Sequence, residues 1–131
     1  YKKKMASKDW IQTISQLFHD KYFNLLPSQR TYSWQKKHVE HYWSDILTVT
    51  KTNQSAELSK INYFLGYIVL LNNGEIEITS TGKQITGFSI TDGQQRLTTT
   101  VLFVVSLLKQ FRLLEQEEVI KELSTNFISV R

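Results

Sequence analysis

The segment from Leu97 to Phe111, LTTTVLFVVSLLKQF, constrains the fold more than any other part of the sequence. Apolar residues fall on almost every side of a helix drawn through this segment, which is typical of a helix buried at the centre of a domain. Its most apolar part, Val101–Leu108, is interrupted by Ser106 and closed by Lys109, whereas a membrane span needs about 20 apolar residues. We therefore predict a soluble domain organised around one central helix.

The chain of 131 residues has the length of one domain, and we expect residues 1–131 to share a single core. Hydrophobic residues make up 40% and charged residues 21%, which favours a folded domain over disorder. The absence of cysteine excludes disulfide frameworks, thiolate zinc sites and cysteine nucleophiles, and it suits the reducing cytoplasm. The opening YKKKMASKDW has no apolar stretch behind its lysines, so we do not expect a signal peptide. With no initiator methionine and no closing signal after NFISVR, the chain resembles the N-terminal part of a longer protein.

Two helices are expected before the central one and a partial helix after it. Ser7 can cap the first helix, which ends near Asp20. Its apolar stripe is formed by Trp10, Ile11, Ile14, Leu17 and Phe18. The second is expected from about Ser33 to about Lys51. The segment 115–131 is more polar and is expected to form the partial C-terminal helix.

Three strands are predicted between the second helix and the central helix. The apolar run 63–71 is typical of a strand buried on both faces, and Asn73-Gly74 after it is a strong tight-turn signal. The alternating segment 75–79 and the segment 84–90 supply two more strands, joined by a turn at 80–82. The earlier segment YFNLLPSQRTYSW contains Pro27 and is expected to be irregular and extended. These elements predict an α+β fold, with a small antiparallel β-meander packed against a buried central helix and flanking helices.

The stretch ITDGQQRLTTT, residues 90–100, joins the last strand to the central helix. Asp92 can cap the helix and Gln95 can bond back to it, as in a capping box, but this leaves Gln94 and Arg96 unexplained. The N–H groups and positive dipole at a helix start also form an anion site. An arginine in the first turn opposes that dipole unless it points at a bound phosphate, where its planar group can bind two oxygens. A phosphate site and a cap with a surface arginine both fit the residues.

The stretch PSQRTYSW, residues 27–34, is a second candidate. In an extended chain, Arg30, Tyr32 and Trp34 share one face, where a cation beside two aromatic rings can hold a phosphate or stack a base. In the other interpretation the two rings pack against the second helix and Arg30 pairs with an acid. The net charge of +4 permits contact with phosphates without requiring it.

Three other patterns in the sequence lack residues that a phosphate loop, a metal site or a catalytic serine would need. STGK, residues 80–83, lacks the glycine and the Ser or Thr that a P-loop requires at the positions of Glu77 and Gln84. His38 and His41 lie one turn apart on a helix, but no third metal ligand accompanies them. No serine has the pattern of a nucleophile elbow.

Taken together, TDGQQRLTT, the upstream QRTYSW and the intervening YFLGYIVL resemble the DGQQR family. These are ParB/sulfiredoxin-like N-terminal domains of GmrSD-type, modification-dependent restriction endonucleases and related anti-phage proteins. The resemblance runs from about Ile11 to Gln110. Leu26 and Ser28 depart from the family pattern, which usually has a proline at the first position and an aromatic residue or asparagine at the second.

The resemblance implies a domain that binds and hydrolyses a nucleoside triphosphate with Mg²⁺ and controls DNA cleavage by a separate HNH-type nuclease domain or subunit. The residues that it carries over to the nucleotide site are Gln29, Arg30, Asp92, Gly93, Gln94, Gln95 and Arg96. Among them we expect Asp92, Gln95 and Arg96 to be catalytic, with Asp92 also holding Mg²⁺. The other expected contacts are Gln29, Arg30, Gly93, Gln94 and Arg96 on phosphate, and Tyr32 and Trp34 on a base or DNA. A non-catalytic DNA-binding module and a partner-docking domain are the alternatives.

Overall fold

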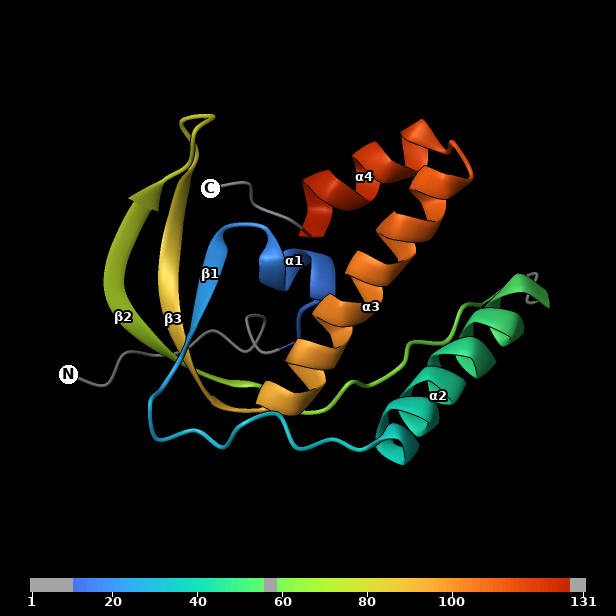
Figure 1. Cartoon of the computed structure of the whole chain (residues 1–131), viewed down its shortest axis with the longest axis horizontal. Helices are drawn as coiled ribbons and strands as arrows, with labels where there is room; N and C mark the ends of the chain where they lie inside the picture. Colours follow the sequence, from blue (N-terminus) through green and yellow to red (C-terminus); the bar gives the residue numbers. More distant parts are fainter. Residues whose placement is uncertain (1–10, 56–58, 128–131) are drawn as a thin grey trace.

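The computed structural model describes residues 11–55 and 59–127, which form four helices and a three-stranded sheet. The order along the chain is α1 (Ile14–Phe18), β1 (Lys21–Leu25), α2 (Lys36–Ser55), β2 (Val69–Ile78), β3 (Gln84–Asp92), α3 (Gln94–Leu113) and α4 (Glu117–Phe127). In Figure 1, the sheet lies on one side of α3, α4 folds back along α3, and α1 lies between the sheet and the helices. The expected α+β class, with a small sheet, a central helix and flanking helices, is confirmed.

The sheet is mixed, with the order β1-β3-β2. β2 and β3 pair antiparallel through the turn predicted at residues 80–82, where Gly82 N donates to Thr79 O at 2.8 Å. β1 pairs parallel with β3, and Tyr22 lies opposite Gly87. The expectation that this part of the chain is irregular was wrong for residues 21–25. Pro27 lies beyond the last ladder position, so it does not interfere with β1.

The meander differs from the prediction in two further respects. Residues 61–68 belong to no helix or strand, so β2 begins at Val69 instead of Tyr63. Asn73-Gly74 does not form a tight turn but a bulge within β2, since residues on both sides of it pair with the same strand β3. Gly74 N donates to Asn72 Oδ1 at 2.7 Å, and Ser89 Oγ donates to Asn73 Oδ1 at 2.8 Å. Tertiary pairing therefore converted a local turn signal into a bulge.

Two predicted helix starts were also displaced. α1 begins at Ile14, where Thr13 and Gln16 form a capping box, and the predicted cap Ser7 lies outside the described residues, as does Trp10. α2 begins at Lys36 and not near Ser33, and it continues to Ser55. Residues 31–34 stay extended because their backbone bonds to the side chain of Gln95.

The core lies where the first turns of α3 meet the sheet and α1. Leu17, Ile90 and Leu97 are buried together, with Phe23 and Leu70 packed against them. On α3, Leu97 is buried on this side, whereas Thr99 and Thr100 are buried beside the hydroxyl groups of Tyr32 and Tyr42. Val101, Leu102 and Val105 are 40–51% exposed. The prediction of burial on all sides of the helix was therefore too strong. Burial of the N-terminal turns is what fixes the position of the DGQQR residues.

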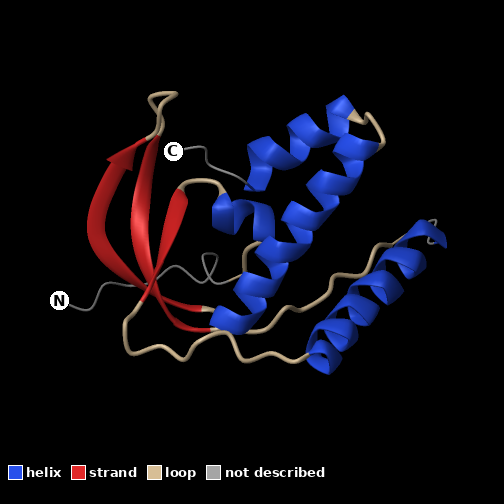
Figure 2. Cartoon of the chain, in the orientation of Figure 1, coloured by secondary structure: helices blue, strands red, loops and turns tan. Residues whose placement is uncertain are grey.

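α2 is joined to α3 mainly through aromatic rings. Tyr42 stacks on Phe103 at 5.5 Å between ring centroids, and Trp43 meets the same ring edge-on at 5.0 Å. The Tyr42 hydroxyl lies 2.8 Å from Thr100 Oγ1. Long loops lead into and out of α2, as the tan segments of Figure 2 show. These loops, and not the helix itself, approach the start of α3.

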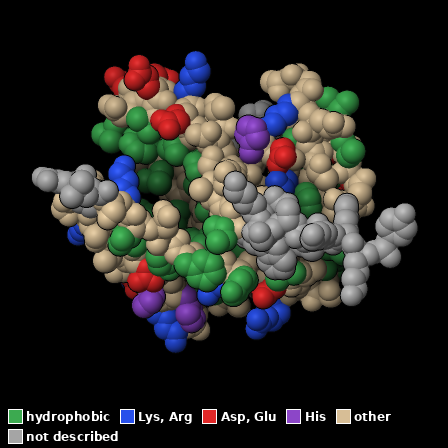
Figure 3. Space-filling view, turned by 180° about the vertical axis from the view of Figure 1, so that it is seen from behind, with side chains coloured by type: hydrophobic (Ala, Val, Ile, Leu, Met, Phe, Trp, Pro, Cys, Tyr) green, Lys and Arg blue, Asp and Glu red, His purple; other side chains and the backbone are tan. Residues whose placement is uncertain are grey.

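Apolar side chains also reach the surface. Val69, Leu71, Ile76 and Ile78 of the edge strand β2 are all about half exposed or more. The space-filling view from behind shows apolar side chains grouped beside basic and acidic ones (Figure 3). Within residues 11–55 and 59–127, no helix combines the length and apolar character needed to cross a membrane.

Candidate functional site

A polar pocket of about 200 Å³ lies between the loop that follows β1 and the N-terminal end of α3. Its lining residues are Gln29, Arg30, Trp34, Asp92, Gly93, Gln94, Gln95 and Arg96. All of them belong to the two segments singled out in the sequence. The structure thus brings together residues about sixty positions apart, including both arginines.

The two segments are held together by glutamine side chains from both sides. Gln29 Nε2 donates to the Thr91 carbonyl oxygen at 3.0 Å. In the other direction, Gln95 Oε1 accepts from Ser33 N at 2.8 Å and from Trp34 N at 3.3 Å. Gln95 Nε2 also donates to the Thr31 carbonyl oxygen at 3.3 Å. Each segment therefore supplies a glutamine side chain that forms hydrogen bonds with backbone groups of the other segment.

The start of α3 is not the capping box that the sequence predicted. Gly93 is the N-cap, in a left-handed conformation with φ of 86°, and within the described residues no side chain caps the helix. Asp92 Oδ1 accepts from the adjacent Gly93 N at 2.8 Å, and Gln95 is committed to the loop instead. Within the described residues, the first backbone N–H groups of α3 therefore receive no side-chain cap at the positive end of the helix dipole.

Gly93 is needed for packing. A Cβ at this position would lie 2.9 Å from the Tyr67 carbonyl oxygen and 3.1 Å from Ile68 Cα. The backbone just before β2 therefore occupies the space that a side chain would take. Its predicted second role, close approach to a ligand, stays a prediction.

Arg96 lies against a glycine that the sequence analysis did not assign to the site. A Cβ on Gly66 would overlap the guanidinium group, and Gly66 has a φ of 104°. Two tyrosines are close enough to feel its charge: burial raises the pKa values of Tyr42 and Tyr63, and Arg96 acts against both shifts. In the sequence, Gly66 is a single glycine within the apolar run 63–71, and that run predicted a strand instead of a site residue.

Three of the residues that line the pocket, Arg30, Gln94 and Arg96, form no side-chain ion pair or hydrogen bond with the described residues. Across residues 11–55 and 59–127, neither Arg30 nor Arg96 forms an ion pair with a carboxylate. Gln94 is only 8% exposed, and within the same residues its side-chain amide makes no hydrogen bond. Its amide atoms still reach solvent, because among the described residues no buried side-chain nitrogen or oxygen lacks a hydrogen-bond partner. A ligand in the pocket can therefore bond to the Gln94 amide.

The two aromatic residues of the loop are used differently. Trp34 lines the pocket and also meets Tyr42 of α2 edge-on, with ring centroids 5.8 Å apart. Tyr32 is not among the lining residues, and its hydroxyl lies 2.9 Å from Thr99 Oγ1. Thr99 Oγ1 already donates to the Gln95 carbonyl oxygen, so Tyr32 is the donor. Tyr32 thus anchors the loop, whereas Trp34 lines the pocket, and its stacking on a base stays a prediction.

Residues 14–129 match the family model of the GmrSD restriction endonuclease N-terminal domain. The chain belongs to this family. Membership connects the GmrSD-type domain with defence by restriction, and it implies DNA and a nuclease domain in the full protein. No curated protein sequence gives a significant match.

Metal-binding groups are sparse in this GmrSD-type domain. Among the residues that the structure describes, no three His, Cys, Asp or Glu side chains are placed to hold a metal ion. His38 Nδ1 accepts from Gln35 N at 3.0 Å at the start of α2, and His41 lies 3.5 Å from Asp45 on the same helix. Asp92 is the carboxylate that lines the polar pocket.

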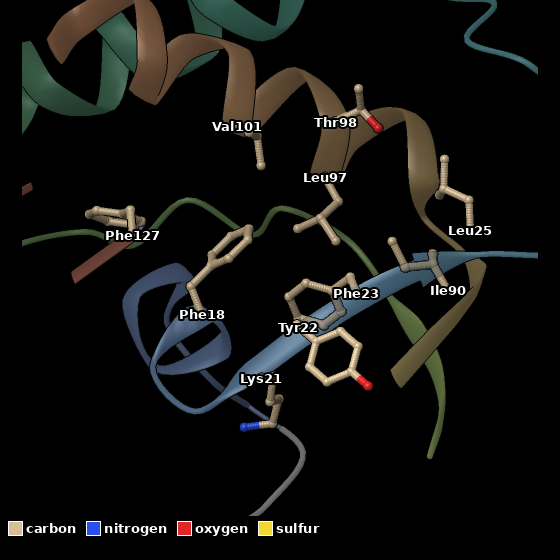
Figure 4. A pocket seen from close by; sticks show the side chains of 10 residues that line it. All are labelled: Phe18, Lys21, Tyr22, Phe23, Leu25, Ile90, Leu97, Thr98, Val101 and Phe127. Atoms are coloured by element: carbon tan, nitrogen blue, oxygen red, sulfur yellow. The ribbon is translucent and has the colours of Figure 1, made fainter. Parts of the chain in front are cut away.

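A second, apolar cavity of about 330 Å³ lies on the other side of the start of α3. Its walls come from α1, β1, β3, α3 and α4, and they are formed by Phe18, Lys21, Tyr22, Phe23, Leu25, Ile90, Leu97, Thr98, Val101 and Phe127. Figure 4 shows aromatic rings from α1 and β1 below the Leu97 and Val101 side chains of α3. Lys21 does not offer a free cation there, because its Nζ lies 2.6 Å from Asp20 Oδ1.

Proposed function

We propose that this domain binds a nucleoside triphosphate by its phosphate groups in the polar pocket, hydrolyses it with Mg²⁺, and so regulates DNA cleavage by a separate nuclease domain. The observation that carries the proposal is that Arg30 and Arg96 line one pocket at the open end of α3, without carboxylate partners among the described residues. Unpaired guanidinium groups and backbone N–H groups together are typical of phosphate sites.

The size of the pocket favours the phosphate chain over the nucleobase. Its volume of about 200 Å³ is below the range of roughly 300–1,000 Å³ common for whole small-molecule ligands. The phosphates therefore fit inside, while sugar and base extend outward past Trp34. With few contacts to the base, we expect ATP and GTP to bind with similar affinity.

The side chains suggest a division of roles. Arg96 and Arg30 neutralise negative charge that spreads over the phosphate oxygens as the terminal bond breaks. Asp92 supplies one carboxylate, which fits Mg²⁺, because this ion is commonly held by one or two carboxylates together with substrate phosphates. Gln94 lines the pocket with an amide available for a phosphate oxygen or a water molecule.

Phosphate release from GTP and ATP in the presence of Mg²⁺ tests the proposal, with Arg96→Ala beside the wild-type chain. We expect turnover that is lost in the variant. Arg112→Ala, in the last turn of the same helix, is the matched control and should keep turnover. Turnover that survives in Arg96→Ala would contradict the assigned role.

The alternative is a DNA-binding module without catalysis. The observation in its favour is that the exposed Lys36 and Lys37 follow directly after the loop that carries Arg30. In that case the chain would show no turnover, and DNA binding would weaken steeply with salt and with Arg30→Ala. The same proteins measured in both assays separate the two functions.

A further inference from the structure

Arg30 itself is exposed, but the backbone on both sides of it is anchored. Gln29 on one side is tied to the end of β3 through its bond to Thr91 O. On the other side, Thr31 O, Ser33 N and Trp34 N are all bonded to Gln95. The place from which the Arg30 guanidinium can reach the pocket is therefore set by these contacts with the β3–α3 junction.

Gln95 is the most extensively used of these anchors. Its Oε1 accepts two N–H groups, which uses both lone pairs of an amide oxygen, and its Nε2 donates to a third group. One N–H of this amide remains for a water molecule or a phosphate oxygen, and the other three hydrogen-bonding positions of the side chain are engaged with the loop. The adjacent Gln94 is the opposite case, because its amide makes no hydrogen bond within the described residues and is reached by solvent from the pocket that Gln94 lines.

We propose that Gln95 is a positioning residue that acts through Arg30, holding the 31–34 backbone so that Arg30 and Arg96 can bind the same phosphate chain, while Gln94 is the glutamine that contacts the ligand. This inference rests on the proposed function and assigns different roles to two neighbouring glutamines. It replaces the catalytic role that the sequence alone assigned to Gln95.

A double-mutant cycle on binding separates positioning from direct contact. The probe is a non-hydrolysable GTP analogue with Mg²⁺, and the dissociation constant is measured by calorimetry on the full chain. We expect Arg30→Ala to weaken binding about ten- to hundredfold. Gln95→Ala should weaken it less or equally, and Gln95→Ala combined with Arg30→Ala should bind no worse than Arg30→Ala alone, because Gln95 acts only through that arginine.

Gln94→Ala is the matched comparison. If Gln94 touches the ligand independently, its effect persists in the Arg30→Ala background and the two losses multiply. A multiplicative loss for Gln95 as well would overturn the positioning role. A loss for Gln94 that disappears without Arg30 would overturn the difference between the two glutamines.

Hydrogen exchange gives a readout that does not need the nucleotide. In Gln95→Ala, the amides of Ser33 and Trp34 should exchange faster, while amides in the middle of α3 keep their protection. Unchanged exchange at these two amides would overturn the claim that Gln95 holds the 31–34 backbone. If Gln95→Ala does not fold, Tyr32→Phe removes the neighbouring anchor to Thr99 and should also show no added loss on top of Arg30→Ala.

The binding measurements also distinguish failure of the proposed function from failure of the positioning role. If the wild-type chain binds neither the GTP analogue nor its ATP counterpart, the nucleotide proposal falls and the role of Gln95 toward a phosphate falls with it. If the wild type binds the analogue but the affinity losses of Gln95→Ala and Arg30→Ala multiply, the nucleotide proposal stands. Only the positioning role of Gln95 is then overturned.

Discussion

The first turns of α3 separate two cavities of opposite character. On one side Gln94, Gln95 and Arg96 face the polar pocket of about 200 Å³, and on the other Leu97 and Thr98 face the apolar cavity of about 330 Å³. The larger cavity is bordered by aromatic rings and an ion-paired lysine. The smaller one gathers guanidinium and amide groups, of which Arg30, Arg96 and Gln94 have no side-chain partner among the residues that the structure describes. The comparison teaches that convergent polar groups, and not volume, identify the candidate site.

The largest expected effect is on turnover in Arg96→Ala. Arginines that stabilise a phosphoryl-transfer transition state are worth about a thousandfold or more in rate. Stability should hardly change, since Arg96 has no carboxylate partner within residues 11–55 and 59–127. Phosphate release measures the turnover and thermal unfolding of the same preparation measures the stability. A large fall in melting temperature would show that Arg96 is structural and would erase the contrast between the two cavities.

The neighbouring Leu97→Ala should give the reverse result. Leu97 is 2% exposed in the core, and replacing such a leucine by alanine costs about 3 kcal/mol of unfolding free energy. Because its side chain faces the apolar cavity, turnover of the folded variant should stay near wild type. Denaturant unfolding and phosphate release provide the measurements. A folded Leu97→Ala chain without turnover would mean that the apolar cavity takes part in the site.

Gly93, beside the polar pocket, can be compared with Gly82 in the hairpin turn, because both have a positive φ. Gly93→Ala should cost about 3 kcal/mol, because strain at positive φ adds to a contact with the backbone of Tyr67 and Ile68. Gly82→Ala is the matched control, with φ of 79° and open space around its Cβ within the described part of the chain, and should cost about 1 kcal/mol. Chemical denaturation of both variants measures the difference. Equal losses would show that the close approach at Gly93 is unimportant.

The smallest expected effect is a pH dependence on the apolar side. Burial and the hydrogen bond to Glu75 raise the pKa of Tyr22 to about 12 from an ordinary value of 10.0. The folded state therefore keeps the tyrosine proton after the unfolded state has lost it, so this stabilisation is complete below pH 10 and is lost as pH rises toward 12. Tyr22→Phe should lack this component of the pH dependence. Parallel curves for variant and wild type from pH 9 to about 12 would contradict it.

Local sequence patterns predicted those elements that depend on near neighbours. The long apolar segment 97–111 predicted the central helix, and residues 80–82 predicted the hairpin turn between β2 and β3. Patterns that required knowledge of a distant partner failed. Asn73-Gly74 has the chemistry of a tight turn, but β3 pairs with both of its flanks, and β1 is recognisable only from its parallel partner.

The candidate site divides in the same way. The sequence identified the two polar segments, and all eight residues that line the polar pocket come from them. It did not reveal which side chains were already engaged. Gln95 was expected at the helix cap and instead bonds to Thr31, Ser33 and Trp34, while Tyr32 was expected beside Arg30 and instead bonds to Thr99.

The sequence by itself determined which chemical groups this protein can bring to a ligand, because guanidinium, amide and carboxylate side chains keep their chemistry in any fold. Only the tertiary structure decided which of those groups remain available. The hydrogen bonds that engage Gln29 and Gln95 cross about sixty residues of chain, so they exist only once β3 and α3 have brought the loop and the helix start together. Arg30, Gln94 and Arg96 remain available for a ligand because that assembly satisfies its own backbone with the other two glutamines.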